Sequence, residues 1–164
     1  MERRKTNGKR NRAAGHQYER DVAKMFRAMG FEFVQTSRAC APLRDKIGID
    51  LANEDELKNG RLPYNIQLKS LSKAANYLQL LEGIPEEPGQ INIVLHRATV
   101  RSKSRFFVSG EYAFLKQSDL LLLLYRIQSA LNYLKEPNGN TEYYSKIKEL
   151  LTCPTLPNPK TELP

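Results

Sequence analysis

Apolar and polar residues alternate along two short stretches of the chain, 47–52 and 64–69. A period of two residues is typical of a half-buried strand, so we expect two strands joined by the charged loop between them. The apolar positions expected to face the core are Ile47, Ile49, Leu51, Tyr64, Ile66 and Leu68. The opposite faces then carry Asp50 on the first strand and Gln67 and Lys69 on the second. If the strands pair, an acid, an amide and an ammonium group share one face, which predicts a metal site with a lysine beside it.

Longer periodicities mark the helices. Apolar residues at three- and four-residue steps from Tyr18 predict a helix over 16–29 that ends at Gly30. Ser118 is a favourable N-cap for a long helix over 119–135, whose leucines form a wide apolar stripe. This stripe exceeds one face, so the helix is either covered by a second subunit or buried within a monomer. The remaining expected elements are strands over 31–35, 91–96 and 106–108, the last two paired in a hairpin, and short helices over 72–81 and 141–151.

Composition divides the chain into three regions. Residues 1–14 are mostly basic and lack apolar periodicity, which predicts a flexible arm that either follows a phosphate backbone or acts as a solubilising tail. Residues 15–135 are expected to form one α/β domain, with a central mixed sheet of about four or five strands flanked by helices. Residues 136–164 are expected to form a C-terminal helix and a proline-rich tail.

The net charge of the chain is +8 and its sequence pI is about 9.5. This surplus favours a polyanionic partner such as nucleic acid, and it also fits a soluble protein with a basic tail. Cys40 and Cys153 lie far apart without metal-ligand or redox spacing, which indicates reduced thiols and a cytoplasmic protein. No stretch approaches the roughly 18 apolar residues of a membrane span, and the basic start lacks the pattern of a signal peptide.

The polar positions follow a recognisable order along the chain. A helix carries Glu19, a strand carries Asp50, and the next strand carries Gln67 and Lys69. This order resembles the PD-(D/E)XK nuclease superfamily, in particular the archaeal-type and phage-encoded Holliday junction resolvases. The matching segments are His16–Asp21, Gly48–Leu51 and Ile66–Ser70, and the resemblance covers roughly residues 15–125.

The resemblance implies a restriction-endonuclease-like core and a phosphodiester-hydrolysing site. It implies that Mg²⁺, or Mn²⁺ in its place, binds Glu19, Asp50, the amide oxygen of Gln67 and the backbone carbonyl of Leu68. These are the oxygen ligands that a hard divalent cation prefers. Lys69 would orient the attacking water or stabilise developing negative charge. Glu19 also has a structural interpretation, because an acid early in a helix is favoured by the helix dipole.

The chain departs from the family pattern at two positions. Ile49 stands where the motif has proline, and Gln67 stands where a second acid is usual. An amide carries no charge, so we expect the site to bind its metal more weakly than a site with two acids there. Asp45 is a spare acid that could assist. His16 and His96 have no partners at metal or catalytic spacing and are interpreted as ordinary surface or strand histidines.

Several residues are candidates for contacts with nucleic acid. Ser37 and Arg38 correspond to the loop that enters the site in resolvase-like chains. The basic turn that follows strand 91–96 is either a phosphate contact or charged for solubility. The candidate nucleic-acid-binding residues are Ser37, Arg38, Arg44, Arg101, Lys103 and Arg105.

The sequence therefore predicts a Mg²⁺-dependent DNA endonuclease, with a branched junction as its preferred substrate. The resemblance implies a homodimer, with the leucine-rich helix 119–135 as a candidate contact. It also implies a cytoplasmic protein, in the host cytoplasm if the chain is phage-encoded. Two alternatives are an inactive nuclease-fold protein that binds nucleic acid or associates with virions, and a nuclease that processes linear DNA ends.

Overall fold

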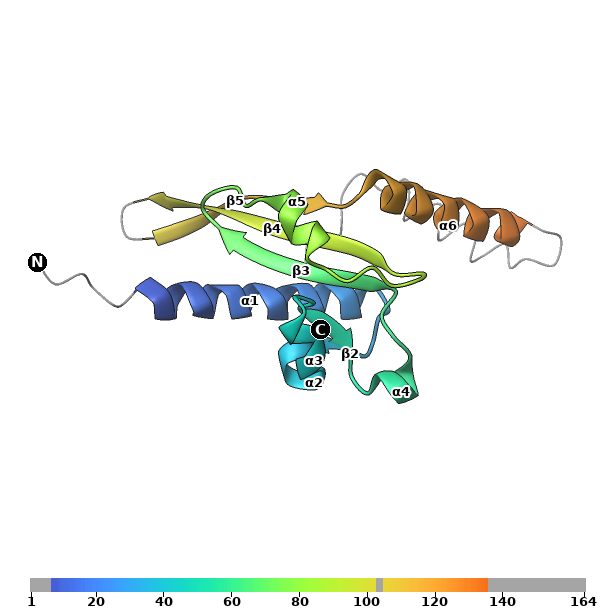
Figure 1. Cartoon of the computed structure of the whole chain (residues 1–164). Coiled ribbons are helices and arrows are strands. Elements are labelled where there is room, and N and C mark those ends of the chain that lie inside the picture. The colour runs from blue at the N-terminus through green and yellow to red at the C-terminus, as the bar shows by residue number, and fades with distance from the viewer. Residues whose placement is uncertain (1–6, 103–104, 136–164) are drawn as a thin grey trace, which may run out of the picture. The chain divides into compact units, whose positions relative to one another are not determined.

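The computed structural model describes residues 7–102 and 105–135 (Figure 1). Its helices are α1 Asn7–Ala28, α2 Ser37–Cys40, α3 Pro42–Lys46, α4 Glu56–Asn59, α5 Tyr77–Glu82 and α6 Gln117–Lys135. Its strands are β1 Val34–Thr36, β2 Leu51–Asn53, β3 Tyr64–Leu71, β4 Ile91–Ser102 and β5 Arg105–Phe114. None of the helices in this described part is long and apolar enough to cross a membrane.

The strands of the described residues form two sheets (Figure 1). β1 and β2 pair antiparallel, with Thr36 opposite Leu51. β3 pairs parallel with β4, and β4 pairs antiparallel with β5, which gives a three-stranded mixed sheet. A hydrogen bond of 2.7 Å from the N–H of Asp50 to the carbonyl of Ile66 joins the smaller sheet to β3. The α/β class is confirmed, but the strands are divided between two sheets instead of forming one sheet of four or five.

α1 packs against β3 (Figure 1). The apolar stripe predicted from the sequence is buried in part, because its last residue, Met29, lies beyond the end of α1 and is 56% exposed. Tyr18 and Val22 of α1 are buried in one cluster with Ile66 and Leu68 of β3. Burial of each aliphatic side chain contributes about 1.5–3 kcal/mol to folding. The helix over 16–29 and the inward face of strand 64–69 are therefore confirmed, and together they fix one face of β3 against α1.

The stretch 47–52 is not a continuous strand. Gly48 has a φ of +82°, which turns the chain, and β2 begins only at Leu51. Ile49 consequently packs in a cluster with residues of α5 and β4, whereas Leu51 packs in the cluster that contains α1. Ile47 is 43% exposed. The expectation that these three residues share one core face was wrong, because the positive φ interrupts the alternation.

Several bounds differ from those expected. α1 already begins at Asn7, so the second half of the predicted flexible arm is helical, in keeping with the high helix propensity of its alanine, lysine and arginine residues. The strand expected over 31–35 begins at Val34, and the helix expected over 72–81 begins at Tyr77. α6 confirms the predicted long helix and starts two residues earlier than expected.

The single domain expected over 15–135 spans two compact units of the chain. The chain divides into two units between Lys116 and Gln117, and α6 belongs to the second unit. The helix expected over 141–151 and the proline-rich tail lie outside the described residues, as does Cys153.

The predicted hairpin is present as β4 and β5, and an arginine ties it to α1. Arg97 donates hydrogen bonds to Glu111 on β5 (2.7 Å) and to Asp21 on α1 (3.0 Å). Its guanidinium also lies 4.2 Å from the centre of the Tyr18 ring. Burial raises the pKa of Tyr18 to about 12. Arg97 therefore holds the three-stranded sheet against α1.

Candidate functional site

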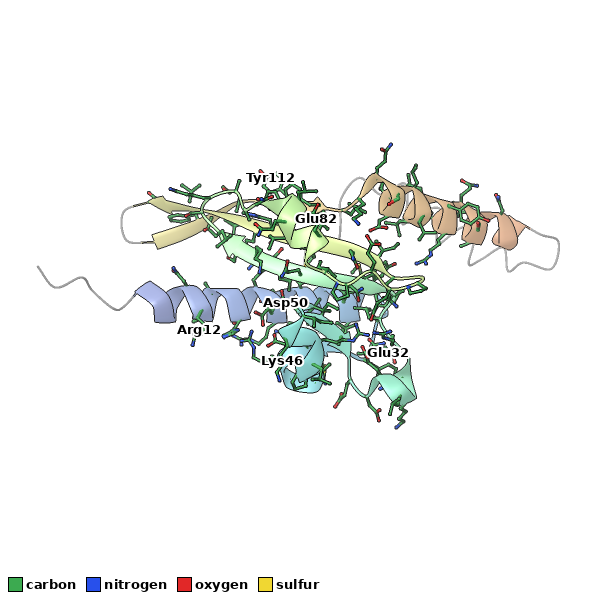
Figure 2. The ribbon with its side chains drawn as sticks, viewed as in Figure 1. Arg12, Glu32, Lys46, Asp50, Glu82 and Tyr112 are labelled. Atoms are coloured by element: carbon green, nitrogen blue, oxygen red, sulfur yellow. The ribbon has the colours of Figure 1, made fainter. Side chains whose placement is uncertain are left out.

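Asp50 lies at the point where the smaller sheet joins β3 (Figure 2). Its backbone N–H donates to Ile66, and its side-chain Oδ2 accepts a hydrogen bond of 2.6 Å from the N–H of Leu68. The carbonyl of Asp50 accepts a hydrogen bond of 2.8 Å from the N–H of Ser37. These bonds fix the backbone of Asp50 from two sides and hold its carboxylate beside the edge of β3.

The environment of Asp50 raises its pKa from the ordinary 3.8 to about 6. Removal of the carboxylate from water is the largest cause, and the hydrogen bond from Leu68 acts in the opposite direction. The negative charge of Glu19 raises the pKa further, the positive charge of Lys69 lowers it, and Asp45 raises it. Because charge interactions weaken with distance, these effects indicate that the three groups lie near Asp50.

Glu19 belongs to a cluster of charged side chains next to Asp50. Its Oε1 lies 3.5 Å from Nδ1 of His16, one helical turn earlier, and 3.6 Å from Nη2 of Arg38. The same Nη2 lies 3.6 Å from Oδ1 of Asp45. The side chain of Glu19 is only 14% exposed, whereas that of Arg38 is 48% exposed. Arg38 therefore bridges two acids from the solvent side.

Gln67 lies over the turn that carries Gly48. A Cβ atom on Gly48 would come within 2.8 Å of Nε2 of Gln67, so the end of this side chain would have to shift. Oε1 of Gln67 is buried and has no hydrogen-bond partner among the described residues. An unsatisfied buried polar atom costs about 1–3 kcal/mol, and such an atom calls for an explanation such as a bound ion or water.

Replacement of Gly48 by alanine is expected to destabilise the protein more than the same change at Gly89. Both glycines have a positive φ, +82° and +78°, so alanine is strained by about 1–2 kcal/mol at each. Only at Gly48 does the new methyl group also collide with Gln67, because no atom lies within 4 Å of the position that a Cβ would take at Gly89. Urea unfolding of the two variants measures the difference. Equal losses of stability would show that Gln67 moves aside at no cost.

The oxygen atoms around Asp50 are of the kind that a hard divalent cation prefers. Asp50 and Glu19 supply carboxylates, and Gln67 supplies a buried amide oxygen that lacks a partner. The N–H and the carbonyl of one strand residue point to the same side, so the Leu68 carbonyl faces the edge on which Asp50 lies. Among the described residues, no three His, Cys, Asp or Glu side chains form a metal-binding group. The donor set proposed here accordingly combines carboxylates with amide and carbonyl oxygens.

The candidate contacts to nucleic acid have different fates in the structure. Arg38 is exposed beside Glu19 and stays a candidate. Ser37 is completely buried, so its hydroxyl cannot reach a phosphate and its backbone instead supports Asp50. Arg101 and Arg105 lie in the paired ends of β4 and β5, without a described side-chain position. Lys103 lies outside the described residues.

Arg44 is a structural residue and not a phosphate contact. Its Nε lies 2.7 Å from Oε1 of Glu56, and its Nη1 lies 3.8 Å from Oε2 of Glu87. Nη1 also donates a hydrogen bond of 3.3 Å to the buried Asn65, which in turn bonds to Asn92 on β4. The side chain is therefore buried and paired with acids. Its bond to Asn65 links α3 to the start of β3.

Two residues near Asp50 have a larger part in the site than the sequence suggested. His16 was interpreted as an ordinary histidine, yet it contacts both Glu19 and Arg38. The three-residue spacing between His16 and Glu19 on one helix is the signal that could have found it. Asp45, a spare acid in the sequence, pairs with Arg38 and acts on the pKa of Asp50. His96, by contrast, is buried in β4, where it contacts the hydroxyl of Tyr77.

Comparisons with known proteins leave the family open. No model of a protein family, no curated protein and no solved structure matches the chain. The nuclease interpretation therefore rests on the residues around Asp50 and on their geometry.

Proposed function

We propose that the protein is a Mg²⁺-dependent DNA endonuclease that hydrolyses phosphodiester bonds. The observation that carries the proposal is the set of groups around Asp50. A desolvated carboxylate with a raised pKa lies beside a strand that carries a buried oxygen without a partner, at Gln67, and an ammonium group, at Lys69. Desolvated acids with charged neighbours are typical of functional sites.

The roles of the residues follow from their positions. Mg²⁺ held by Glu19, Asp50, Gln67 and the carbonyl of Leu68 would polarise the phosphoryl group and favour ionisation of water. Asp50 has to be ionised for this, and a cation offsets the cost of its burial. Lys69 would stabilise negative charge that develops on the phosphate.

Arg38 is suited to a second role. It pairs with Glu19 and Asp45 from the solvent side, where a cation would compete for the same carboxylates. An arginine released from these acids can form charge-assisted hydrogen bonds with a phosphate group. We therefore infer that Arg38 would be available to contact a phosphate group if a cation took its place at these acids.

A branched DNA junction is the proposed substrate. The chain is short and basic, and no sequence-reading module is evident in it. Symmetric cleavage of a junction requires two sites, so a homodimer belongs to this proposal, with α6 as a candidate contact.

Cleavage of a labelled four-way junction and of its matched linear duplex tests the proposal. With Mg²⁺ or Mn²⁺ we expect symmetric nicks in the junction, and no nicks when Asp50→Asn or Lys69→Ala replaces the wild type. Cleavage of the linear duplex ends alone would indicate an end-processing nuclease. The proposal is overturned if the wild type with either metal cuts no junction, flap, single-stranded or duplex DNA.

An inactive protein that binds nucleic acid is the second candidate. The observation that favours it is the neutralisation of Glu19 and Asp45 by Arg38, together with an uncharged amide at Gln67. Such a protein should bind DNA equally well with chelator and should not be stabilised by Mg²⁺. If cleavage is absent, Gln67→Glu is the variant that tests whether the missing charge is the reason.

A further inference from the structure

Four basic side chains form a stripe along α1, which we call the α1 basic stripe: Arg12, Arg20, Lys24 and Arg27. At 100° per residue they fall within an arc of about 120°. The stripe lies away from the buried Tyr18, and its ends are about 22 Å apart along the helix axis. In Figure 2, Arg12 projects from α1 on the side turned away from β3. The four side chains are exposed, and the buried Ala23 lies within the same arc beneath them.

The α1 basic stripe keeps its positive charge. All four side chains are exposed, and within the described part of the chain none of them forms an ion pair with a carboxylate. Arg20 bonds only to the amide of Gln17, and Arg27 to a backbone carbonyl. Other arginines are each paired with two acids: Arg38, Arg44, Arg61 and Arg97. Uncompensated charge is thus a feature of the stripe and not of every arginine in the protein.

The stripe is unfavourable for the helix itself. Arg20 and Lys24 are four residues apart and Lys24 and Arg27 three, and like charges at these spacings destabilise a helix by a few tenths of a kcal/mol. The helix dipole offsets this only at the C-terminal end, because it favours a cation such as Arg27 in the last turn of α1. An anionic partner would remove this repulsion.

A pocket of about 400 Å³ lies along the C-terminal half of the stripe. The lining residues are Arg20, Ala23, Lys24, Arg27, Glu32, Gln35 and Thr36. Three of the four basic residues of the stripe, Arg20, Lys24 and Arg27, line the pocket. Gln35 and Thr36 come from β1, which follows α1 along the chain. The pocket is linked to the candidate site through the backbone, since Arg20 follows Glu19 on α1 and Thr36 precedes the Ser37 that bonds to Asp50.

We propose that the α1 basic stripe binds the phosphate backbone of the DNA strand whose scissile bond lies at Asp50. This inference rests on the proposed nuclease function, because it places the substrate relative to that site. Side chains one helical turn apart, about 5.4 Å, can contact successive phosphates along a strand. Such contacts carry no sequence information, which suits an enzyme that recognises a DNA structure.

Fluorescence anisotropy of a labelled four-way junction, with chelator and at several salt concentrations, tests the stripe without cleavage. We expect Arg20→Gln/Lys24→Gln to weaken binding at least about tenfold. The salt slope, which is the steepness with which the logarithm of the binding constant falls with the logarithm of the salt concentration, should decrease by about two. Arg27 is kept in this variant because it bonds to the backbone. For a charge-matched pair of controls, Lys24→Gln should lower the slope by about one, whereas Lys58→Gln on α4 should leave it unchanged.

The two proposals fail in different ways. If the double variant binds the junction as tightly as the wild type, with the same salt slope, the proposed role of the α1 basic stripe is overturned even where the wild type cuts DNA. Equal losses of affinity in Lys24→Gln and Lys58→Gln would also overturn this role, because they would show an effect of net charge alone. A wild type that binds through the stripe but never cleaves supports the stripe and contradicts the nuclease function.

Discussion

Replacement of Asp50 by asparagine is expected to abolish cleavage and, at the same time, to stabilise the metal-free protein. Asparagine has nearly the same shape, and its amide oxygen can still accept the hydrogen bond from Leu68. It carries no charge, so the cost of burying a carboxylate beside Glu19 disappears. The same loss of charge removes a ligand that the metal requires. Stability and activity therefore change in opposite directions.

The size of the gain depends on pH in a defined way. The pKa of Asp50 is about 6 in the folded protein, against 3.8 as its ordinary value, so the folded state binds more protons between these values. Wild-type stability is then unaffected by Asp50 below about pH 4 and falls as the pH rises towards 6. The full cost is up to about 3 kcal/mol at neutral pH. The stability difference between Asp50→Asn and wild type should appear over this window.

Urea unfolding at pH 4, 5, 6 and 7.5 measures this difference. Glu82→Gln, at an exposed acid on α5 (Figure 2), is the control and should show no comparable gain at pH 7.5. Addition of Mg²⁺ should stabilise the wild type, by about 2.7 kcal/mol at a hundred times its Kd, and should leave Asp50→Asn unchanged. If Asp50→Asn is less stable than the wild type at neutral pH, the folded protein stabilises the ionised carboxylate, and this prediction is contradicted.

The sequence predicted those parts of the fold that depend on regular periodicity. The alternation from Tyr64 to Lys69 and the apolar stripe that starts at Tyr18 survive in the structure, because the apolar residues of these elements pack together in one cluster. The strand prediction for 47–52 was wrong because one glycine with a positive φ places Ile49 and Leu51 in different clusters. Residue identities alone do not reveal the sign of φ.

The candidate site was predictable to a similar degree. Glu19 and Lys69 are far apart in sequence and both affect the pKa of Asp50, while their roles in a metal site stay a prediction. The loop residues were harder to predict, because their burial depends on distant partners. Arg44 resembles a phosphate contact in the sequence, and only the fold shows its pairing with Glu56 and Glu87.

Replacement of Lys69 by methionine is expected to reduce cleavage by about 10²–10³-fold while leaving metal binding in place. Methionine keeps much of the length of the side chain but removes the positive charge that acts on Asp50. Loss of that charge removes one of the two cationic groups near the acids and leaves Arg38 in place, so stabilisation by Mg²⁺ should be retained or increased. It also raises the pKa of Asp50 further, so stability should fall with ionisation of Asp50 over a higher pH range than in the wild type.

Single-turnover cleavage and metal-dependent unfolding of Lys69→Met separate these effects. Lys73→Met, at an exposed lysine beyond the end of β3, is the matched control and should cleave as the wild type does. A purely structural lysine would predict loss of stability without an upward shift in the pH dependence. Cleavage by Lys69→Met at the wild-type rate would remove Lys69 from the chemistry, and the metal ligands alone would then have to stabilise the charge on the phosphate.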